Sequence, residues 1–313
     1  METCLVTGGC GFFGSHIVEE LVKQGYKVKV IDSLIKGKLN SIKYLVDQGK
    51  VEFIEGDIRN RDSVDRAMKD VDYVFHTAAV HIQRSMESPG ECIDVNLNGS
   101  YNVFKSALDH DIKRVVFSSS SSVYGDPEKL PMSETDLINP TEPYGAAKWM
   151  DEKLLQYLAT KGLKYNTLRY FNVYGPRQAA HAYYTTVVTA FVRRVLNNEP
   201  PIMNGKGDQS FDFTHVSDVV RANLAAMKSE TVNEVFNVGT GTSTSVKELA
   251  ELLLRLVGSD LKPIFRDREV VCNRRQADII KSEKLLGFKS KMNVEQGLKE
   301  FVKELRENSK LYS

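Results

Sequence analysis

Short apolar runs alternate with helical patterns through the first half of the chain, and this alternation restricts the fold more than any other feature. The runs are rich in β-branched residues and are predicted to be strands: TCLVT, KVKVID, VEFIEG, DYVFHT, RVVFSS and KYNTLRYF. The helices are expected in FFGSHIVEELVKQG, near 39–48, in RDSVDRAMKD, in ECIDVNLNGSYNVFKSALDH, near 143–160 and near 184–197. Continuously apolar strands are typical of a parallel sheet, because crossover helices cover both of its faces. The pattern therefore predicts an α/β fold with a doubly wound parallel sheet.

After Gly175 the alternation becomes irregular, and loops interrupt shorter elements up to a last helix near 293–308. We expect a main domain over 1–175 and a smaller lobe formed mainly by 176–313. The strand-like segment NEVFNVG suggests that parts of 211–240 return to the main sheet. At 313 residues the chain has room for one large or two ordinary domains.

Composition excludes several classes of protein. Hydrophobic residues make up 42% and charged residues 27%, and the formal net charge of +1 gives no indication of a nucleic-acid partner. The start METCLVTGGC leaves no room for a signal peptide, and no apolar run is long enough to span a bilayer, which predicts a cytoplasmic protein. The four cysteines are widely spaced, so we expect reduced thiols and no metal site.

Three glycines, Gly8, Gly11 and Gly14, stand between the first predicted strand and the first predicted helix. Glycines at this spacing let the backbone approach a pyrophosphate, which the N–H groups of the helix N-terminus can bind. The alternative is a tight turn with no ligand. A predicted strand, a helix and a later carboxylate accompany the glycines, so the sequence favours a Rossmann-type dinucleotide site.

That carboxylate is Asp32, which ends the second predicted strand eighteen residues after Gly14. It can accept hydrogen bonds from both hydroxyls of an adenosine ribose and would repel a 2′-phosphate, so NAD is favoured over NADP. Lys36 and Lys38 could weaken this preference. Asp57, with the following Ile58, is a candidate to contact the adenine edge, although Asp57 could instead cap the next helix.

Tyr144 and Lys148 are four residues apart at the start of a predicted helix, in PYGAAKWMDEKLL, so they share one helix face. An ammonium group beside a phenol favours the phenolate, and we expect the pKa of Tyr144 to fall toward neutrality. A surface pair without function is the alternative. However, the serine-rich segment FSSSSSVYG ends a predicted parallel strand, and the carboxyl edge of such a sheet is where ligands bind.

With these motifs together, nearly the whole chain resembles the extended short-chain dehydrogenases. The resemblance is to their NAD-dependent nucleotide-sugar epimerases and dehydratases, with the UDP-galactose (UDP-glucose) 4-epimerases nearest. It implies that Ser120, four residues before Tyr124, hydrogen-bonds the reacting sugar oxygen, or Ser121 if the register shifts. Tyr144 and Lys148 then complete the catalytic set, and the resemblance implies that both also bind the dinucleotide. Further residues that the resemblance places at the dinucleotide are Phe12, Phe13, Thr77, Ala78 and Phe171.

The same segment bears on the reaction. In the family this sequence resembles, 4,6-dehydratases carry acidic residues just after the catalytic hydroxyl residue, decarboxylases tend to have a glutamate there, and 3,5-epimerases have a cysteine two residues before the tyrosine. This chain has Ser121 and Ser122 instead. The resemblance therefore implies 4-epimerisation, in which C4 is oxidised and the hydride returns to its other face. Net oxidation or reduction at C4, or a non-catalytic NAD-binding scaffold, are the alternatives.

The resemblance implies a nucleotide-diphosphate sugar as substrate, with a UDP-sugar favoured, and it implies that Asn172 and Arg268 contact the diphosphate. Two departures concern this end of the site. Phe211 stands where many relatives have arginine, and Val270 and Val271 stand near an expected aspartate. Arginines bind phosphate well through two parallel hydrogen bonds. The arginines that could take the place of the one replaced by Phe211 are Arg84, Arg177, Arg274 and Arg275.

The sequence also allows expectations for three histidines and for the oligomeric state. His81 and His181 could approach the sugar from loops, whereas His215 is expected to support the C-terminal lobe. The resemblance also implies a homodimer that pairs two helices of each subunit, near 95–110 and 145–160.

Overall fold

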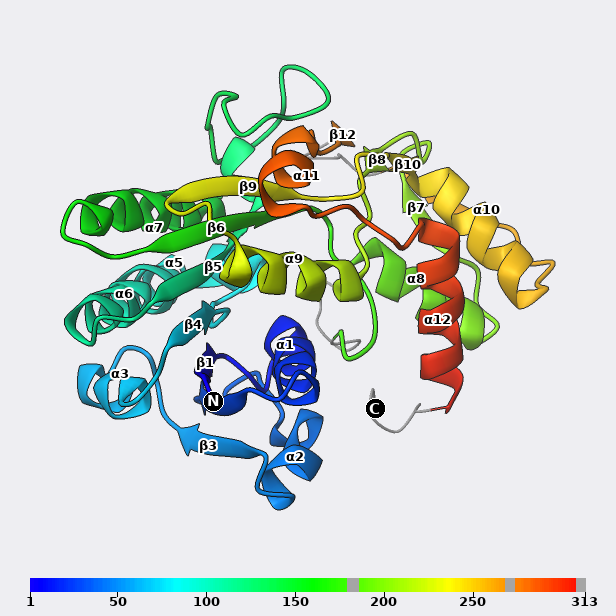
Figure 1. The fold of residues 1–313 in the computed structure, drawn as a ribbon. Coiled ribbons are helices and arrows are strands. Elements are labelled where there is room, and N and C mark those ends of the chain that lie inside the picture. The colour runs from blue at the N-terminus through cyan, green and yellow to red at the C-terminus, as the bar shows by residue number, and fades with distance from the viewer. Residues whose placement is uncertain (179–185, 268–273, 308–313) are drawn as a thin grey trace.

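The largest element of the computed structural model, which describes residues 1–178, 186–267 and 274–307, is a parallel sheet of seven strands (Figure 1). The strands lie in the order β3, β2, β1, β4, β5, β6, β9. Their bounds are Thr3–Thr7 (β1), Lys27–Asp32 (β2), Val51–Glu55 (β3), Tyr73–His76 (β4), Arg114–Ser120 (β5), Tyr165–Tyr170 (β6) and Glu234–Val238 (β9). Every neighbouring pair is parallel. The predicted doubly wound parallel sheet is confirmed.

Two apolar layers cover the two faces of this sheet. Successive side chains of a strand point to opposite faces. In β1, Cys4 and Val6 belong to a cluster that includes helices α1 and α9, whereas Leu5 packs into a cluster formed with α3, α6 and α7. All three side chains are fully buried. This two-sided burial explains why the strands read as continuously apolar.

The helix predicted near 184–197 belongs to the C-terminal part. The helices of the main sheet agree with the prediction in part, because those at 82–87, 216–228 and 280–286 are not predicted from the sequence. They span Phe12–Lys23 (α1), Lys43–Asp47 (α2), Arg61–Met68 (α3), Ile82–Glu87 (α4), Pro89–Cys92 (α5), Ser100–Asp109 (α6), Pro143–Ala159 (α7), Val216–Lys228 (α9) and Ile280–Leu286 (α11). Short 3-10 helices occur at Leu39–Ser41 (η1) and Ser121–Tyr124 (η3).

One predicted helix differs from expectation. The segment ECIDVNLNGSYNVFKSALDH forms α5 and α6 with a π-helix between them, η2, at Ile93–Gly99. Within η2 the amide of Asn96 bonds both backbone groups of Val80, at 2.6 and 2.8 Å, and the Ser100 hydroxyl donates to the Asn96 carbonyl oxygen. A π-helical segment is rare and often occurs at functional sites. Here it holds the chain that follows β4 against the helix layer.

The C-terminal part has a separate apolar cluster of its own. Its elements are Val187–Leu196 (α8), Ile202–Asn204 (β7), Ser210–Phe211 (β8), Thr244–Ser245 (β10), Val246–Val257 (α10), Ile264–Arg266 (β11), Arg274–Arg275 (β12) and Val294–Glu307 (α12). The short strands form two small sheets, β10, β8, β12 and β11, β7. Strand β9 lies beside β6 in the main sheet, whereas β8 does not. The exact division into two domains stays a prediction.

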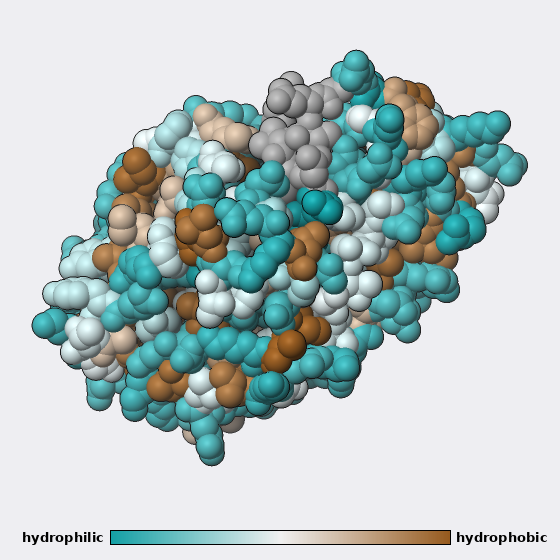
Figure 2. All heavy atoms as spheres, turned by 90° about the horizontal axis from the view of Figure 1, so that it is seen from above, coloured by the Kyte–Doolittle hydropathy of each residue, from teal (hydrophilic) through white to brown (hydrophobic). Residues whose placement is uncertain are grey.

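Figure 2 shows one face of the molecule, on which the apolar residues lie singly or in small groups among hydrophilic ones. None of the helices within 1–178, 186–267 and 274–307 is long and apolar enough to cross a membrane.

Candidate active site

The glycine turn after β1 is shaped by close approaches that exclude side chains. Gly8 has φ = +68°, a left-handed conformation that glycine adopts at little cost. A Cβ on Gly8 would lie 2.8 Å from the Cα of Ala78, and one on Gly14 would collide with the carbonyl oxygen of Gly8. The turn is thus bare backbone at the N-terminus of α1, and these residues fit a dinucleotide pyrophosphate.

Asp32 is buried at the end of β2 beside this turn. Its carboxylate accepts hydrogen bonds from the backbone N–H groups of Cys10 and Leu34, both at 2.9 Å. A Cβ on Gly37 would lie 2.7 Å from both carboxylate oxygens, so the chain also passes closely over Asp32. The anion is held in one orientation, and each oxygen has a further lone pair available for a ribose hydroxyl.

We predict that Asp32→Asn weakens NAD binding about tenfold or more and reduces the preference for NAD over NADP. A hydrogen bond to a charged group contributes about 1.5–3 kcal/mol, and the charge that repels a 2′-phosphate is removed. Titration calorimetry with both dinucleotides checks this, with an unfolding curve as control because Asp32 also bonds the turn. An unchanged ratio of the two affinities would contradict this role of Asp32.

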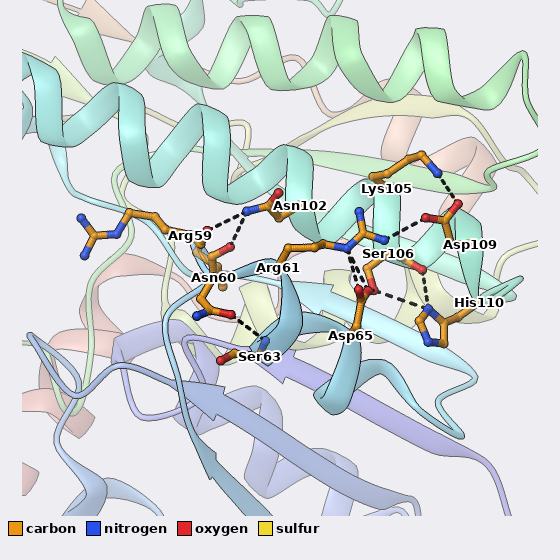
Figure 3. Close-up of polar contacts among 11 residues, drawn as sticks. Arg59, Asn60, Arg61, Ser63, Asp65, Asn102, Lys105, Ser106, Asp109 and His110 are labelled. Atoms are coloured by element: carbon orange, nitrogen blue, oxygen red, sulfur yellow. Dashed lines mark hydrogen bonds and ion pairs between the residues drawn. The ribbon is translucent and has the colours of Figure 1, made fainter.

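The loop after β3 carries Asp57 and Ile58 and is tied to α6 (Figure 3). Asn102 donates hydrogen bonds of 3.0 Å to the carbonyl oxygens of Ile58 and Arg59. Asp57 pairs with Arg59 at 2.6 Å, and the hydrogen bonds from Arg59 lower the pKa of its carboxyl. The cap of α3 is Asn60, which accepts from the Ser63 N–H, so the interpretation of Asp57 as that cap is wrong. Its contact with adenine stays a prediction.

The other residues predicted at the dinucleotide differ in accessibility. Phe12 and Phe13 are partly buried at the start of α1, and Thr77 donates to the Thr7 carbonyl oxygen at 2.7 Å beside the glycine turn. Ala78 follows, in contact with Gly8. Phe171 is fully buried against Tyr124, so a contact of its side chain with a nicotinamide requires this packing to open.

The serine run is part of β5 and η3, and most of its hydroxyls have specific partners. Ser118 shares a hydrogen bond of 2.9 Å with the Tyr170 hydroxyl, and Ser119 donates to Glu152 at 2.6 Å. Ser120 ends β5, where its hydroxyl accepts from the Ser122 N–H and caps η3. The run is therefore an ordered strand end and not a solvated spacer, and Ser120 is its partly exposed member.

Tyr144 and Lys148 lie on α7 beside this strand end. Glu142 caps α7 by accepting from the Gly145 N–H at 2.9 Å, which places Tyr144 in the first turn. Lys148 is 1% exposed, and its Nζ lies 4.6 Å from the ring centroid of Phe117 and 5.8 Å from that of Tyr144. Ser120 hydrogen-bonds the Tyr144 hydroxyl. The structure thus brings together the three residues that the sequence predicts to be catalytic.

The protonation of this group differs from expectation. Burial, together with the negative charge of Glu142, raises the pKa of Tyr144, and the hydrogen bond from Ser120 only partly opposes this. Burial also lowers the pKa of Lys148 to about 8. The expected fall of the tyrosine pKa is therefore wrong, because burial and the negative charge of Glu142 both disfavour the phenolate.

The predicted substrate residues lie in varied surroundings. Asn172 has φ = +32°, a strained conformation often found at functional sites, and its amide lies 3.5 Å from the Asp212 carbonyl oxygen. Arg84 is ion-paired with Glu91 at 2.6 Å. Arg268, Val270, Val271 and His181 lie outside the described residues.

Two of the remaining arginines have defined contacts. Arg177 binds Glu19 and His16 on α1, so it joins the C-terminal part to the main sheet. Arg275 on β12 donates to the Ser121 hydroxyl at 3.0 Å, which brings its guanidinium to the residue next to Ser120. The sequence names Arg275 only as one of several candidates, because pairing of β12 with β8 is a long-range contact.

The histidines follow the sequence interpretation in part. His215 is buried in the C-terminal lobe, where it caps α9 through the Ser217 N–H and packs edge-on against Tyr174. His81 precedes α4 and makes no side-chain cap there. Asn96, which positions Val80, was not anticipated. Its signal in the sequence was a polar residue inside an otherwise amphipathic helical pattern.

Comparison with known proteins identifies the class. Residues 4–239 match the model of the NAD dependent epimerase/dehydratase family. The chain is 38% identical to a putative UDP-glucose 4-epimerase of Methanocaldococcus jannaschii, over 98% of this chain and 99% of that protein. It is 35% identical to a UDP-N-acetyl-alpha-D-glucosaminuronate decarboxylase of Bacillus cytotoxicus, over 98% of both.

Among solved structures, the chain is similar to the UDP-glucose 4-epimerase of Thermotoga maritima crystallised with UDP-glucose. The TM-score is 0.93 at 37% identity, and the match covers 98% of this chain and 99% of that one. The chain therefore belongs to the NAD dependent epimerase/dehydratase family, and NAD is its cofactor.

Proposed function

We propose that the protein is a nucleotide-sugar 4-epimerase. The observation that carries this proposal is the convergence of Ser120, Tyr144 and Lys148 at the end of β5, with Ser121 and Ser122 next to them where other chemistries of the family need an acid. Similarity to UDP-glucose 4-epimerases supports the proposal. The decarboxylase relative makes a direct test of the reaction necessary.

In this proposal the chain's own residues move one proton twice. Ser120 holds the C4 hydroxyl oxygen. Tyr144 removes the hydroxyl proton as a phenolate, a form that the combined positive charges of Lys148 and bound NAD would favour against the effect of burial. Lys148 stabilises the phenolate while the 4-keto sugar turns over in the site. Tyr144 then returns the proton to the product oxygen. Bound NAD supplies the hydride acceptor and donor, so no net redox change results.

The substrate is proposed to be a UDP-sugar, as in the relatives whose names include one. Arg275 is proposed to neutralise the diphosphate, because it lies beside Ser121 and can bind two phosphate oxygens at once. A hollow of about 320 Å³ lies beside β12 and is lined by Lys206, Asp208, Gln209 and Arg274. We propose that it takes the nucleoside. Asn172 and Arg84 stay candidate sugar-diphosphate ligands, and Arg84 would first have to leave Glu91.

The test is to incubate the purified enzyme with a panel of nucleotide sugars and to follow the C4 configuration by NMR. Inversion at C4 without added NAD and without release of a keto sugar supports epimerisation. Consumption of external dinucleotide, or NADH that accumulates in one turnover, would show net redox chemistry instead. If the protein binds NAD but turns over none of the nucleotide sugars, the result would favour a non-catalytic NAD-binding scaffold.

We also propose a homodimer formed through α6 and α7, which lie side by side (Figure 1). Four large side chains on η2, α6 and α7 are exposed: Ile93, Tyr101, Met150 and Tyr157. Exposed apolar groups on neighbouring helices are typical of an interface.

Met150→Glu combined with Tyr157→Glu should convert the dimer to a monomer in sedimentation velocity. A monomeric unsubstituted protein would contradict this proposal.

The cytoplasmic location stays a prediction.

A further inference from the structure

A buried carboxylate without a good partner lies one helical turn beyond Lys148. Asp151 is 0% exposed on α7, and neither of its carboxylate oxygens has a hydrogen bond of good geometry within the described part of the chain. A lone buried carboxylate is costly unless a charge nearby compensates it. Residues three apart on a helix lie on one face, so Asp151 faces the same interior as Lys148.

The other groups around Lys148 are either already paired or neutral. Glu152 is committed to a bidentate pair with Arg169, at 3.0 and 2.7 Å. Burial raises the pKa of the Cys92 thiol on α5, so this thiol is neutral, and burial lowers the pKa of His76 on β4, so this imidazole is neutral.

The remaining acid close to the site is Glu142. Its carboxylate caps the first turn of α7, where it bonds the Gly145 N–H and faces Tyr144. Asp151 is thus the acid near Lys148 that has no other structural task.

Polar groups also connect Asp151 to the glycine turn. The Thr7 hydroxyl lies 2.7 Å from Nδ1 of His76, and Nε2 of His76 lies 2.9 Å from the Ser100 hydroxyl on α6. Burial raises the pKa of the Asp151 carboxyl well above its ordinary value, and the positive charge of Lys148, followed by the nearby Ser100 hydroxyl, opposes this effect. Because His76 is neutral, this chain orients hydroxyl dipoles but supplies no charge to Asp151.

We propose that Asp151 is a positioning residue for Lys148: its carboxylate is the counter-charge that keeps the buried lysine protonated before the dinucleotide and substrate arrive. The two side chains do not form a direct ion pair, so the ammonium stays available above the Phe117 ring, beside Tyr144. This proposal deepens the proposed function, on which its consequence for turnover rests. Its consequences for NAD binding and stability do not depend on the substrate.

The test uses Asp151→Asn, Lys148→Met and the double variant in the full-length protein, with Ser100→Ala as a matched control that alters the same polar chain without removing charge. An opposite charge within about 4–6 Å shifts a pKa by about one to three units. The pH above which NAD affinity falls should therefore move down by at least about one unit in Asp151→Asn and stay in place in Ser100→Ala. The alkaline limit of turnover should move with it.

Urea unfolding of the unsubstituted protein and of the three charge variants gives the second readout. In the protein that keeps Lys148, Asp151→Asn should lower the ratio of folded to unfolded protein about tenfold or more. In the Lys148→Met background the same change should raise this ratio, because it removes a buried carboxylate that has lost its compensating charge. The same effect in both backgrounds, or an unmoved pH profile, would overturn the proposal. If no nucleotide sugar is turned over, the proposed function fails, whereas NAD titration and unfolding still decide the role of Asp151.

Discussion

Tyr144→Phe is expected to lower turnover by about 10²–10⁴-fold while the variant folds and binds NAD as before. General acid–base groups contribute about this much, and the phenyl ring keeps the volume of the side chain. The hydroxyl that is lost bonds Ser120 and carries no other described contact that holds the fold. Turnover of the preferred nucleotide sugar and NAD affinity are the two measurements.

Tyr157→Phe is the matched control for this change. It removes a hydroxyl from the same helix on the face proposed for the dimer, where the apolar ring is kept, and we expect unchanged turnover. Near-normal turnover by Tyr144→Phe, with the nucleotide sugar and NAD both bound, would show that another group moves the proton.

Glu152→Gln is expected to lower the free energy of unfolding by about 3–5 kcal/mol, a large share of the roughly 5–15 kcal/mol that stabilises an ordinary domain. Glu152 on α7 and Arg169 on β6 form an ion pair of 2.7 Å in which both side chains are almost fully buried. Losing the carboxylate leaves a guanidinium without compensation. Because Ser119 also donates to Glu152, the end of β5 should loosen as well. Chemical denaturation measures the loss.

Two controls separate burial from charge. Asp47→Asn breaks the exposed pair between Lys43 and Asp47 and should change stability by less than about 1 kcal/mol. Replacing both buried partners, with Glu152→Leu and Arg169→Met, should recover much of the loss, since apolar groups of similar volume can replace a buried pair. Equal effects of Glu152→Gln and Asp47→Asn would contradict this account.

The fold was predictable because its signals are local. Alternating apolar and helical segments require no knowledge of distant contacts, and the glycines before α1 show through their spacing alone that backbone must pass close to backbone. The same holds for Tyr144 and Lys148, whose spacing on one helix already places them together. Where the local signal was ambiguous, as for Asp57, two interpretations stayed open, and the structure excludes the helix cap because Asn60 caps α3.

The amino-acid sequence by itself therefore determined the first six strands of the main sheet, most of the helices between them, the glycine turn with Asp32, and the Ser, Tyr and Lys set. Only the tertiary structure decided which acid stands near Lys148, that Arg275 reaches Ser121, and that the pKa of Tyr144 rises where spacing predicted a fall. The reason is physical. Patterning and turn chemistry act between neighbours in the chain, whereas burial, and with it the cost of a charge, depends on which distant segments pack around a side chain.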